Sequence, residues 1–137
     1  MSHLVLFDNE AVQALSGPAQ AKHRRVLAHL DVLAGRKMRG RPVRLAVPTA
    51  VRVEAGWDRT DRRSVLLDRL GLTDLSLDSP AADRAAGVRS ALGVSVADAH
   101  LGAAMTAAPE GRVTVLSSDP ADVRRMSGTK NVVVVTV

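Results

Sequence analysis

Four acidic residues spread along the chain are the side chains best suited to chemistry: Asp8, Glu54, Asp98 and Asp119. Carboxylates that lie close together repel one another and raise one another's pKa, and a divalent cation between them removes that repulsion. Hard cations such as Mg²⁺ and Mn²⁺ bind carboxylate oxygens and need neither His nor Cys, and this chain has no Cys. Because such ions activate water and stabilise the leaving oxygen in phosphodiester cleavage, these acids predict a metal-dependent nuclease. Asp122, one turn after Asp119, is an auxiliary candidate.

Five apolar stretches predict the strands that must position these acids. They cover residues 3–7, 43–47, 72–77, 113–116 and 132–135. The stretch 72–77 is the least regular of the five, because its leucines alternate imperfectly. The others are mostly continuous apolar runs, which indicate strands that are covered on both faces.

Helical spacing of apolar residues fills the intervals between these strands. The predicted helices cover residues 9–15, 19–33, 49–55, 61–70, 80–92 and 95–108, and a last helix opens at Asp119. Gly35 is expected to stop the second helix, and Thr49 is expected to cap the third. Strands that alternate with helices predict an α/β protein, a three-layer α/β/α sandwich with a mainly parallel sheet. The length favours one domain over residues 1–137.

The predicted strands place the acids at one edge of the sheet. Asp8 follows the first strand and Asp119 follows the fourth, while Glu54 lies in the helix after the second. Asp98 lies in the first turn of the helix that Ser95 opens. Sites in open parallel sheets form outside the carboxyl ends of the strands, so these acids are expected to meet there.

Most of these acids also have a purely structural interpretation. Asp8 and Asp119 are suited to cap helices, the latter with Pro120 at the favoured first helical position, and Ser95 with Asp98 fits a capping box. Glu54 is expected on a helix with little solvent-exposed surface. Burying its charge without a partner is costly, which favours a shared cation.

The basic residues are concentrated between residues 22 and 44. This segment holds eight Lys and Arg residues against one acid, Asp31, in a chain of net charge +5. Such a block suits a partner that bears phosphates, or an acidic protein, and is otherwise a solvated surface. A predicted loop within it carries the candidate RNA-binding residues Arg36, Lys37, Arg39 and Arg41. A loop that leads into the amino end of a strand normally faces the edge opposite the acids.

Four segments resemble the PIN-domain ribonucleases, especially the VapC toxins of type II toxin-antitoxin pairs. They are residues 4–8 (LVLFD), 47–54 (VPTAVRVE), 95–104 (SVADAHLGAA) and 115–119 (VLSSD), and they occur in the family's order along the whole chain. The third and fourth segments are the most specific.

The resemblance implies a function and a set of site residues. It implies a Mg²⁺-dependent endoribonuclease that a cognate antitoxin inhibits and that often forms homodimers. Asp8, Glu54, Asp98 and Asp119 match the family's catalytic acids, with Asp8, Asp98 and Asp119 as metal ligands. Ser117 matches a small hydroxyl residue two positions before the last acid, where threonine is commoner. Another departure is Asn9, where the family often has a small or hydroxyl residue.

Other classes of protein fit the sequence less well. Residues 93–97 form only a loose nucleophile elbow, after a helix instead of a strand, and no His follows Asp119. The four histidines lack metal-ligand spacing and are interpreted as surface or packing residues. A phosphoacceptor receiver domain would carry paired acids after the first strand, where Asp8 is followed by Asn9. The strongest alternative is a noncatalytic PIN-fold module that binds RNA or protein.

Composition restricts the remaining possibilities. Phe7 and Trp57 are the only aromatic residues, which disfavours folds that bind single strands by base stacking. No stretch has the length of a membrane span, and the apolar residues before Asp8 are too few for a signal peptide. A cytoplasmic protein without membrane contact is therefore expected.

Overall fold

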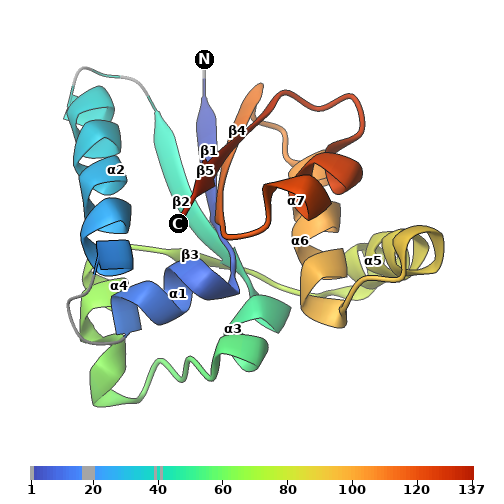
Figure 1. Cartoon of the computed structure of the whole chain (residues 1–137), viewed down its shortest axis with the longest axis horizontal. Helices are drawn as coiled ribbons and strands as arrows, with labels where there is room; N and C mark the ends of the chain where they lie inside the picture. The colour runs from blue at the N-terminus through green and yellow to red at the C-terminus, as the bar shows by residue number, and fades with distance from the viewer. Residues whose placement is uncertain (1, 17–20, 39, 41) are drawn as a thin grey trace.

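Five parallel strands form one sheet in the computed structural model, which describes residues 2–16, 21–38, 40 and 42–137 (Figure 1). The strands are β1 (His3–Phe7), β2 (Val43–Pro48), β3 (Thr73–Leu75), β4 (Arg112–Ser117) and β5 (Val132–Thr136). Their order in the sheet is β3-β2-β1-β4-β5. Each of the five predicted strands is therefore confirmed, with β3 shorter than its apolar stretch.

The central strand β1 is buried along its whole length. It pairs in parallel with β2 on one side and with β4 on the other, so that Leu6 lies opposite Ala46 and Val115. This register aligns the carboxyl ends of β1 and β4, where Phe7 pairs with Leu116. Residues that follow these two strands consequently emerge side by side.

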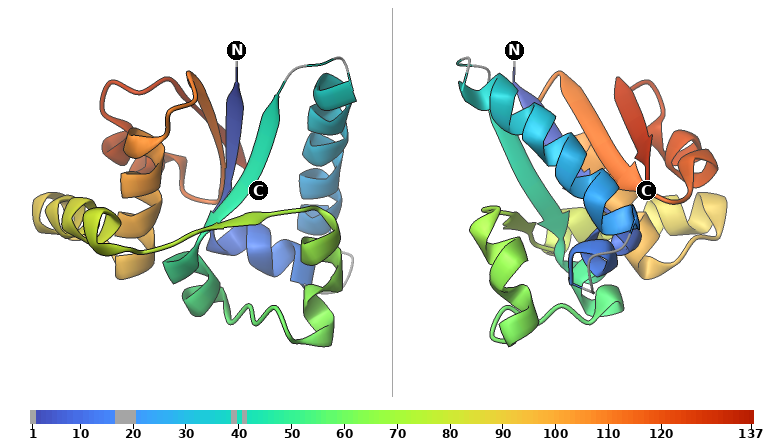
Figure 2. Two further views of the ribbon diagram at one scale, coloured as in Figure 1. Left: turned by 180° about the vertical axis from the view of Figure 1, so that it is seen from behind. Right: turned by 60° about the vertical axis from the view of Figure 1, so that its left-hand side comes forward.

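Helices cover both faces of the sheet. They are α1 (Asn9–Ser16), α2 (Ala21–Met38), α3 (Thr49–Ala55), α4 (Val65–Arg69), α5 (Ser79–Leu92), α6 (Val96–Ala107) and α7 (Pro120–Ser127), with a 3₁₀ turn η1 (Arg62–Ser64) before α4. Figures 1 and 2 show α1, α2 and α4 on one face, α6 and α7 on the other, and α5 outside α6. The predicted α/β/α sandwich is confirmed.

Two apolar clusters fill the spaces between these layers. Val5, Phe7 and Val12 belong to the cluster on the α1–α2 side, and Leu4 and Met105 belong to the one on the α6–α7 side. Both are built mainly from aliphatic side chains, as the near absence of aromatic residues requires. No helix in the described part of the chain is long and apolar enough to cross a membrane.

Three predictions about helix ends were wrong. Gly35 does not stop α2, which continues to Met38 because an isolated glycine lowers helix stability without ending a helix. The helix predicted over 61–70 is a 3₁₀ turn followed by the short α4. Thr49 is the first residue of α3 instead of its cap, since Pro48 holds the cap position.

Candidate metal-binding active site

Asp8 is the most firmly held of the candidate acids. It follows β1 directly, and only 8% of its surface is exposed. Its Oδ1 accepts a hydrogen bond of 2.7 Å from the backbone N–H of Asn9, and its Oδ2 accepts one of 2.8 Å from the Ser117 hydroxyl. One of these donors is the first residue of α1 and the other is the last residue of β4, and together they fix this carboxylate at the carboxyl edge.

Ser117 connects the carboxyl ends of the two central strands. It is the last residue of β4 and is fully buried. Its Oγ donates to Asp8 and accepts a hydrogen bond of 3.0 Å from the backbone N–H of Asp119. The hydroxyl therefore positions one candidate acid and the backbone of another.

Asp119 combines a structural role with an exposed carboxylate. It caps α7, where its Oδ1 accepts from the backbone N–H of Asp122 at 3.2 Å, so the capping interpretation is confirmed. Its other oxygen has no partner among the described residues. Asp122 pairs with Arg125 at 3.1 Å and, among the described residues, is the one candidate acid with a cationic partner.

Asp98 enters the edge from the other helical layer. It lies in the first turn of α6 and is half-buried. Its backbone N–H donates to the Ser95 hydroxyl at 3.1 Å, which confirms Ser95 as the helix cap. The negative charge of Glu54, on α3, acts on its carboxyl group.

The expectation that Glu54 is a buried charge was wrong. Glu54 is exposed, and its neighbour Val53 is 81% exposed. The reason is the position of α3, which extends beyond the carboxyl end of β2 instead of lying flat on a face of the sheet (Figure 1). Only Val51 of this helix is fully buried. The cost of burial therefore says nothing about a cation near Glu54.

Acids from three other segments influence the ionisation of Asp98. Burial raises the pKa of the Asp98 carboxyl, although the hydrogen bond with Ser95 lowers it. The negative charges of Asp8, Glu54 and Asp122 raise this pKa further. Electrostatic repulsion therefore acts on Asp98 from acids that are far apart in sequence, while the predicted metal site at the carboxyl edge stays a prediction.

The pKa of Asp8 is also raised. Burial is the main cause, and the hydrogen bonds from Ser117 and Asn9 oppose it. The charges of Glu10 and Asp119 add repulsion. Asp8 is therefore a carboxylate whose charge the surrounding protein disfavours.

The donor set fits a hard cation in its chemistry. Within the described residues, Asp8, Glu54, Asp98 and Asp119 form no ion pair with Lys or Arg. The side-chain Oδ1 of Asn9 is buried with no hydrogen-bond partner, as expected of a group that meets a water or an ion. In the described part of the chain, however, no three acidic or His side chains converge closely enough to ligate one ion as they stand.

The described candidate RNA-binding residues, Arg36 and Lys37, lie away from these acids (Figure 2). Arg36 and Lys37 belong to the last turn of α2 instead of the predicted loop, and Arg39 and Arg41 lie outside the described residues. Figure 2 shows this end of α2 at the edge where β2 begins, opposite the edge that holds Asp8. RNA binding by these residues stays a prediction. Arg36 and Lys37, at the end of α2, are not next to the acids (Figure 2).

Comparison of the chain with known protein families, with curated proteins and with solved structures finds no match. The functional argument consequently rests on the residues and on their arrangement.

Proposed function

We propose that this protein is a Mg²⁺-dependent endoribonuclease that acts as the toxin of a toxin-antitoxin pair in the cytoplasm. The observation that supports it is the set of mutually repelling carboxylates at the carboxyl edge, held without cationic partners among the described residues. A structural role requires neither the repulsion nor the missing partners, whereas a divalent cation makes both favourable.

The metal ligands in this proposal are Asp8, Asp98 and Asp119. Asp8 is fixed in place by its hydrogen bonds, while the exposed Asp119 has freedom to turn toward it. Mg²⁺ suits this set better than Zn²⁺ because all the ligands are oxygens and Mg²⁺ retains several waters; Mn²⁺ is an alternative. When bound, such an ion supplies an activated water and charge stabilisation for the leaving oxygen.

The remaining residues have supporting roles. Ser117 orients Asp8 through its hydroxyl, and Glu54, exposed beside Asp98, is the carboxylate that accepts a proton from the attacking water. Asp122 adds negative charge near Asp98, although Arg125 partly compensates it.

The proposed antitoxin inhibits by occupying the acidic edge. An Arg or Lys of a partner's tail can replace the cation among carboxylates that lack other partners. An apolar part of the same tail would cover neighbouring surface. Co-expression with such a partner is expected to suppress the growth arrest that the toxin causes.

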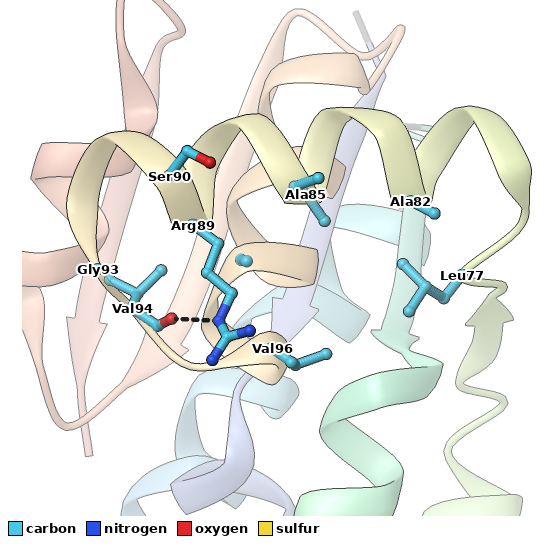
Figure 3. Close-up of a pocket in the computed structure, with 10 residues that line it drawn as sticks. Leu77, Ala82, Ala85, Arg89, Ser90, Gly93, Val94 and Val96 are labelled. Carbon is cyan, nitrogen blue, oxygen red and sulfur yellow. Dashed lines mark hydrogen bonds between the residues drawn. The ribbon is translucent and has the colours of Figure 1, made fainter.

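A homodimer is the second proposed assembly, and an apolar surface supports it. A cavity of about 570 Å³ lies between α5 and the start of α6, lined mainly by alanine and aliphatic side chains (Figure 3). Leu77 and Val96 line it and are 38% and 49% exposed. Helix α3 contacts the segment that lines this cavity, because the Thr49 hydroxyl accepts a hydrogen bond from the backbone N–H of Leu77. The exposed Val53 lies one turn after Thr49 on the same helix. Exposed apolar patches of this kind mark protein interfaces.

The alternative is a noncatalytic PIN-fold module that binds RNA or protein. The presence of all four acids argues against it, because binding alone does not need them.

RNA cleavage by the purified protein tests the proposal. We expect cleavage in Mg²⁺, none in chelator, and recovery on adding Mg²⁺ or Mn²⁺. Asp8→Asn should fold normally and lose activity, while Asp83→Asn, at an exposed position on α5, should cleave as the wild type does. Cleavage by Asp8→Asn at the wild-type rate would reject the site, and binding without cleavage by the wild type would favour the noncatalytic module.

A further inference from the structure

The helix that carries Glu54 begins without a cap of its own. Pro48 is at the N-cap position of α3 and makes no side-chain capping hydrogen bond. The hydroxyl of Thr49 accepts from the backbone N–H of Leu77 at 3.1 Å, so it ties the helix to the segment before α5. The first N–H groups of a helix need acceptors, and α3 is only seven residues long.

His100 of α6 supplies an acceptor for one of these groups. Its Nδ1 accepts a hydrogen bond of 3.3 Å from the backbone N–H of Ala50, and the side chain is 1% exposed. Because Nδ1 accepts this hydrogen bond, the proton of the neutral ring is on Nε2.

These contacts join the two helices that carry candidate acids. Glu54 lies one turn after Ala50 on α3, and Asp98 lies two residues before His100 on α6. Figure 1 shows the two helices adjacent at the carboxyl edge, and the charge of Glu54 reaches Asp98. Any shift of the start of α3 relative to α6 therefore changes the separation of the two carboxylates.

We infer that His100 is a positioning residue that caps α3 from α6 and so sets Glu54 against Asp98. The inference rests on the proposed function, because the placement of Glu54 matters only if the acids form a metal site. His100 itself touches neither substrate nor metal. A polar residue in the most apolar helix of the chain is the sequence signal for it, which was interpreted only as packing.

Three variants separate this role from packing. His100→Leu keeps an apolar side chain of similar bulk and removes the acceptor, while His100→Asn keeps an acceptor near the position of Nδ1. His3→Leu is the matched control, because His3 is also buried and hydrogen-bonded, to Thr114 at 2.7 Å, but lies at the amino end of β1.

Two measurements on the full chain need no catalytic activity. The ring-nitrogen resonances of His100 should show an unprotonated Nδ1 and a protonated Nε2. The exchange of the Ala50 amide should be slow in the wild type and in His100→Asn, and faster in His100→Leu. A protonated Nδ1, or an Ala50 amide that exchanges equally in all three, would overturn the capping role.

Binding of Mn²⁺ alone, measured by titration calorimetry, tests the positioning role. Glu54 is not a ligand in the proposed site, but its charge acts on the ligand Asp98, so we expect His100→Leu to weaken binding about tenfold, at the lower end of outer-shell effects on metal sites. His100→Asn and His3→Leu should stay close to wild type. In a Glu54→Gln background the His100→Leu effect should disappear, because the placement of α3 no longer matters. Persistence of the full effect in that background would reject positioning through Glu54.

The outcomes distinguish a failure of the positioning role from a failure of the proposed function. If the wild type binds no Mn²⁺ and does not cleave RNA, the proposed function fails and positioning fails with it, even where the resonances confirm the cap. If the wild type binds Mn²⁺ and cleaves, but His100→Leu matches His3→Leu in affinity, only the positioning inference is wrong.

Discussion

Ser117 shows how much of the candidate site depends on one hydroxyl group. Its Oγ contacts the carboxylate of Asp8 and the backbone of Asp119, and no water reaches it because the residue is fully buried. The sequence allowed the prediction that Ser117 belongs to the site through the resemblance. It did not indicate that the same oxygen serves both acids, because that depends on the parallel register of β1 and β4.

Replacing Ser117 should alter the ionisation of Asp8. In Ser117→Ala, loss of the hydrogen bond that lowers the pKa of Asp8 should raise that pKa further. The acid limb of the pH–activity profile is expected to move to higher pH, with activity reduced at neutral pH, and Ser117→Thr should restore the wild-type profile. A Ser117→Ala enzyme with an unshifted acid limb would contradict this role of the hydroxyl.

The raised pKa of Asp8 also predicts how stability depends on pH. The folded state holds this proton more tightly than the unfolded state, so the free energy of unfolding falls as pH rises from the ordinary aspartate pKa through the raised one. Without metal, Asp8→Asn should be more stable than the wild type at neutral pH, and the difference should vanish in acid. Urea denaturation over a pH series measures it, with Asp83→Asn as the control.

A wild type that gains stability over this pH window relative to Asp8→Asn would show that the Asp8 charge is favourable in the fold. Added Mg²⁺ should stabilise the wild type and leave Asp8→Asn unchanged.

At the scale of elements, the strands were predictable and several helix boundaries were not. A strand covered on both faces leaves a continuous apolar run, and β1 is such a run; the equally apolar β5 is an edge strand, where Val133 is 40% exposed. The position of α3 left no such pattern, because Val51 and Val53 look equally suited to a core although one is buried and the other is 81% exposed. Which of them faces the sheet is decided by the connections on either side of α3.

A cluster of contacts around Trp57 holds the segment that follows α3 in place. The guanidinium groups of Arg52 and Arg59 lie 5.2 and 4.5 Å from the centre of the indole ring, and the indole N–H donates to Ser64 at 2.7 Å. Both arginines also pair with Asp74, next to β2 on strand β3. This cluster connects α3, the start of α4 and the edge strand.

Removing one arginine should loosen that connection. Arg59→Ala loses the ring contact and its ion pairs with Asp74 and Asp68, all partly exposed, so we expect a cost of about 1–2 kcal/mol in the free energy of unfolding. Arg62→Ala, at an exposed position nearby, should change it by less than about 0.5 kcal/mol. Chemical denaturation compares the two, and equal effects would show that the cluster adds no stability.

At the scale of the whole molecule, the last turn of α2, which carries Arg36 and Lys37, lies at the edge of the sheet opposite the acids (Figure 2). This placement agrees with the sequence analysis, in which a segment that leads into the amino end of a strand normally faces the edge opposite the acids. Replacing Arg36, Lys37, Arg39 and Arg41 by Ser should flatten the salt dependence of RNA binding by up to about 0.7 per lost contact. The turnover rate at saturating RNA should stay unchanged, since Arg36 and Lys37 are at the end of α2 away from the acids (Figure 2) and the proposed role of all four residues is RNA binding.

RNA titrations over a range of salt concentrations, made in an Asp98→Asn background to prevent cleavage, measure that slope. An unchanged slope would reassign the block to binding of a protein partner or to solubility.

The proposed homodimer gives a second prediction at this scale. Ala86 lines the apolar cavity and is exposed, so Ala86→Arg should place a charge in the interface and yield a monomer. Ala28→Arg, at an exposed position on α2, is the matched control and should remain dimeric. Light scattering should give the wild type twice the 14.5 kDa mass of the chain. A monomeric wild type at all concentrations would reject this interface.

The central claim is that the carboxyl edge of the sheet binds a divalent cation, and paramagnetic broadening by Mn²⁺ tests it most directly. With substoichiometric Mn²⁺, the backbone amide signals of Asn9, Asp98 and Asp119 should broaden first, and Asp98→Asn should abolish the effect. Mg²⁺ should compete with it. Broadening centred on other acids, such as Asp68 and Asp74, would contradict the account. The absence of any broadening at Mn²⁺ concentrations that should saturate the site would contradict it too.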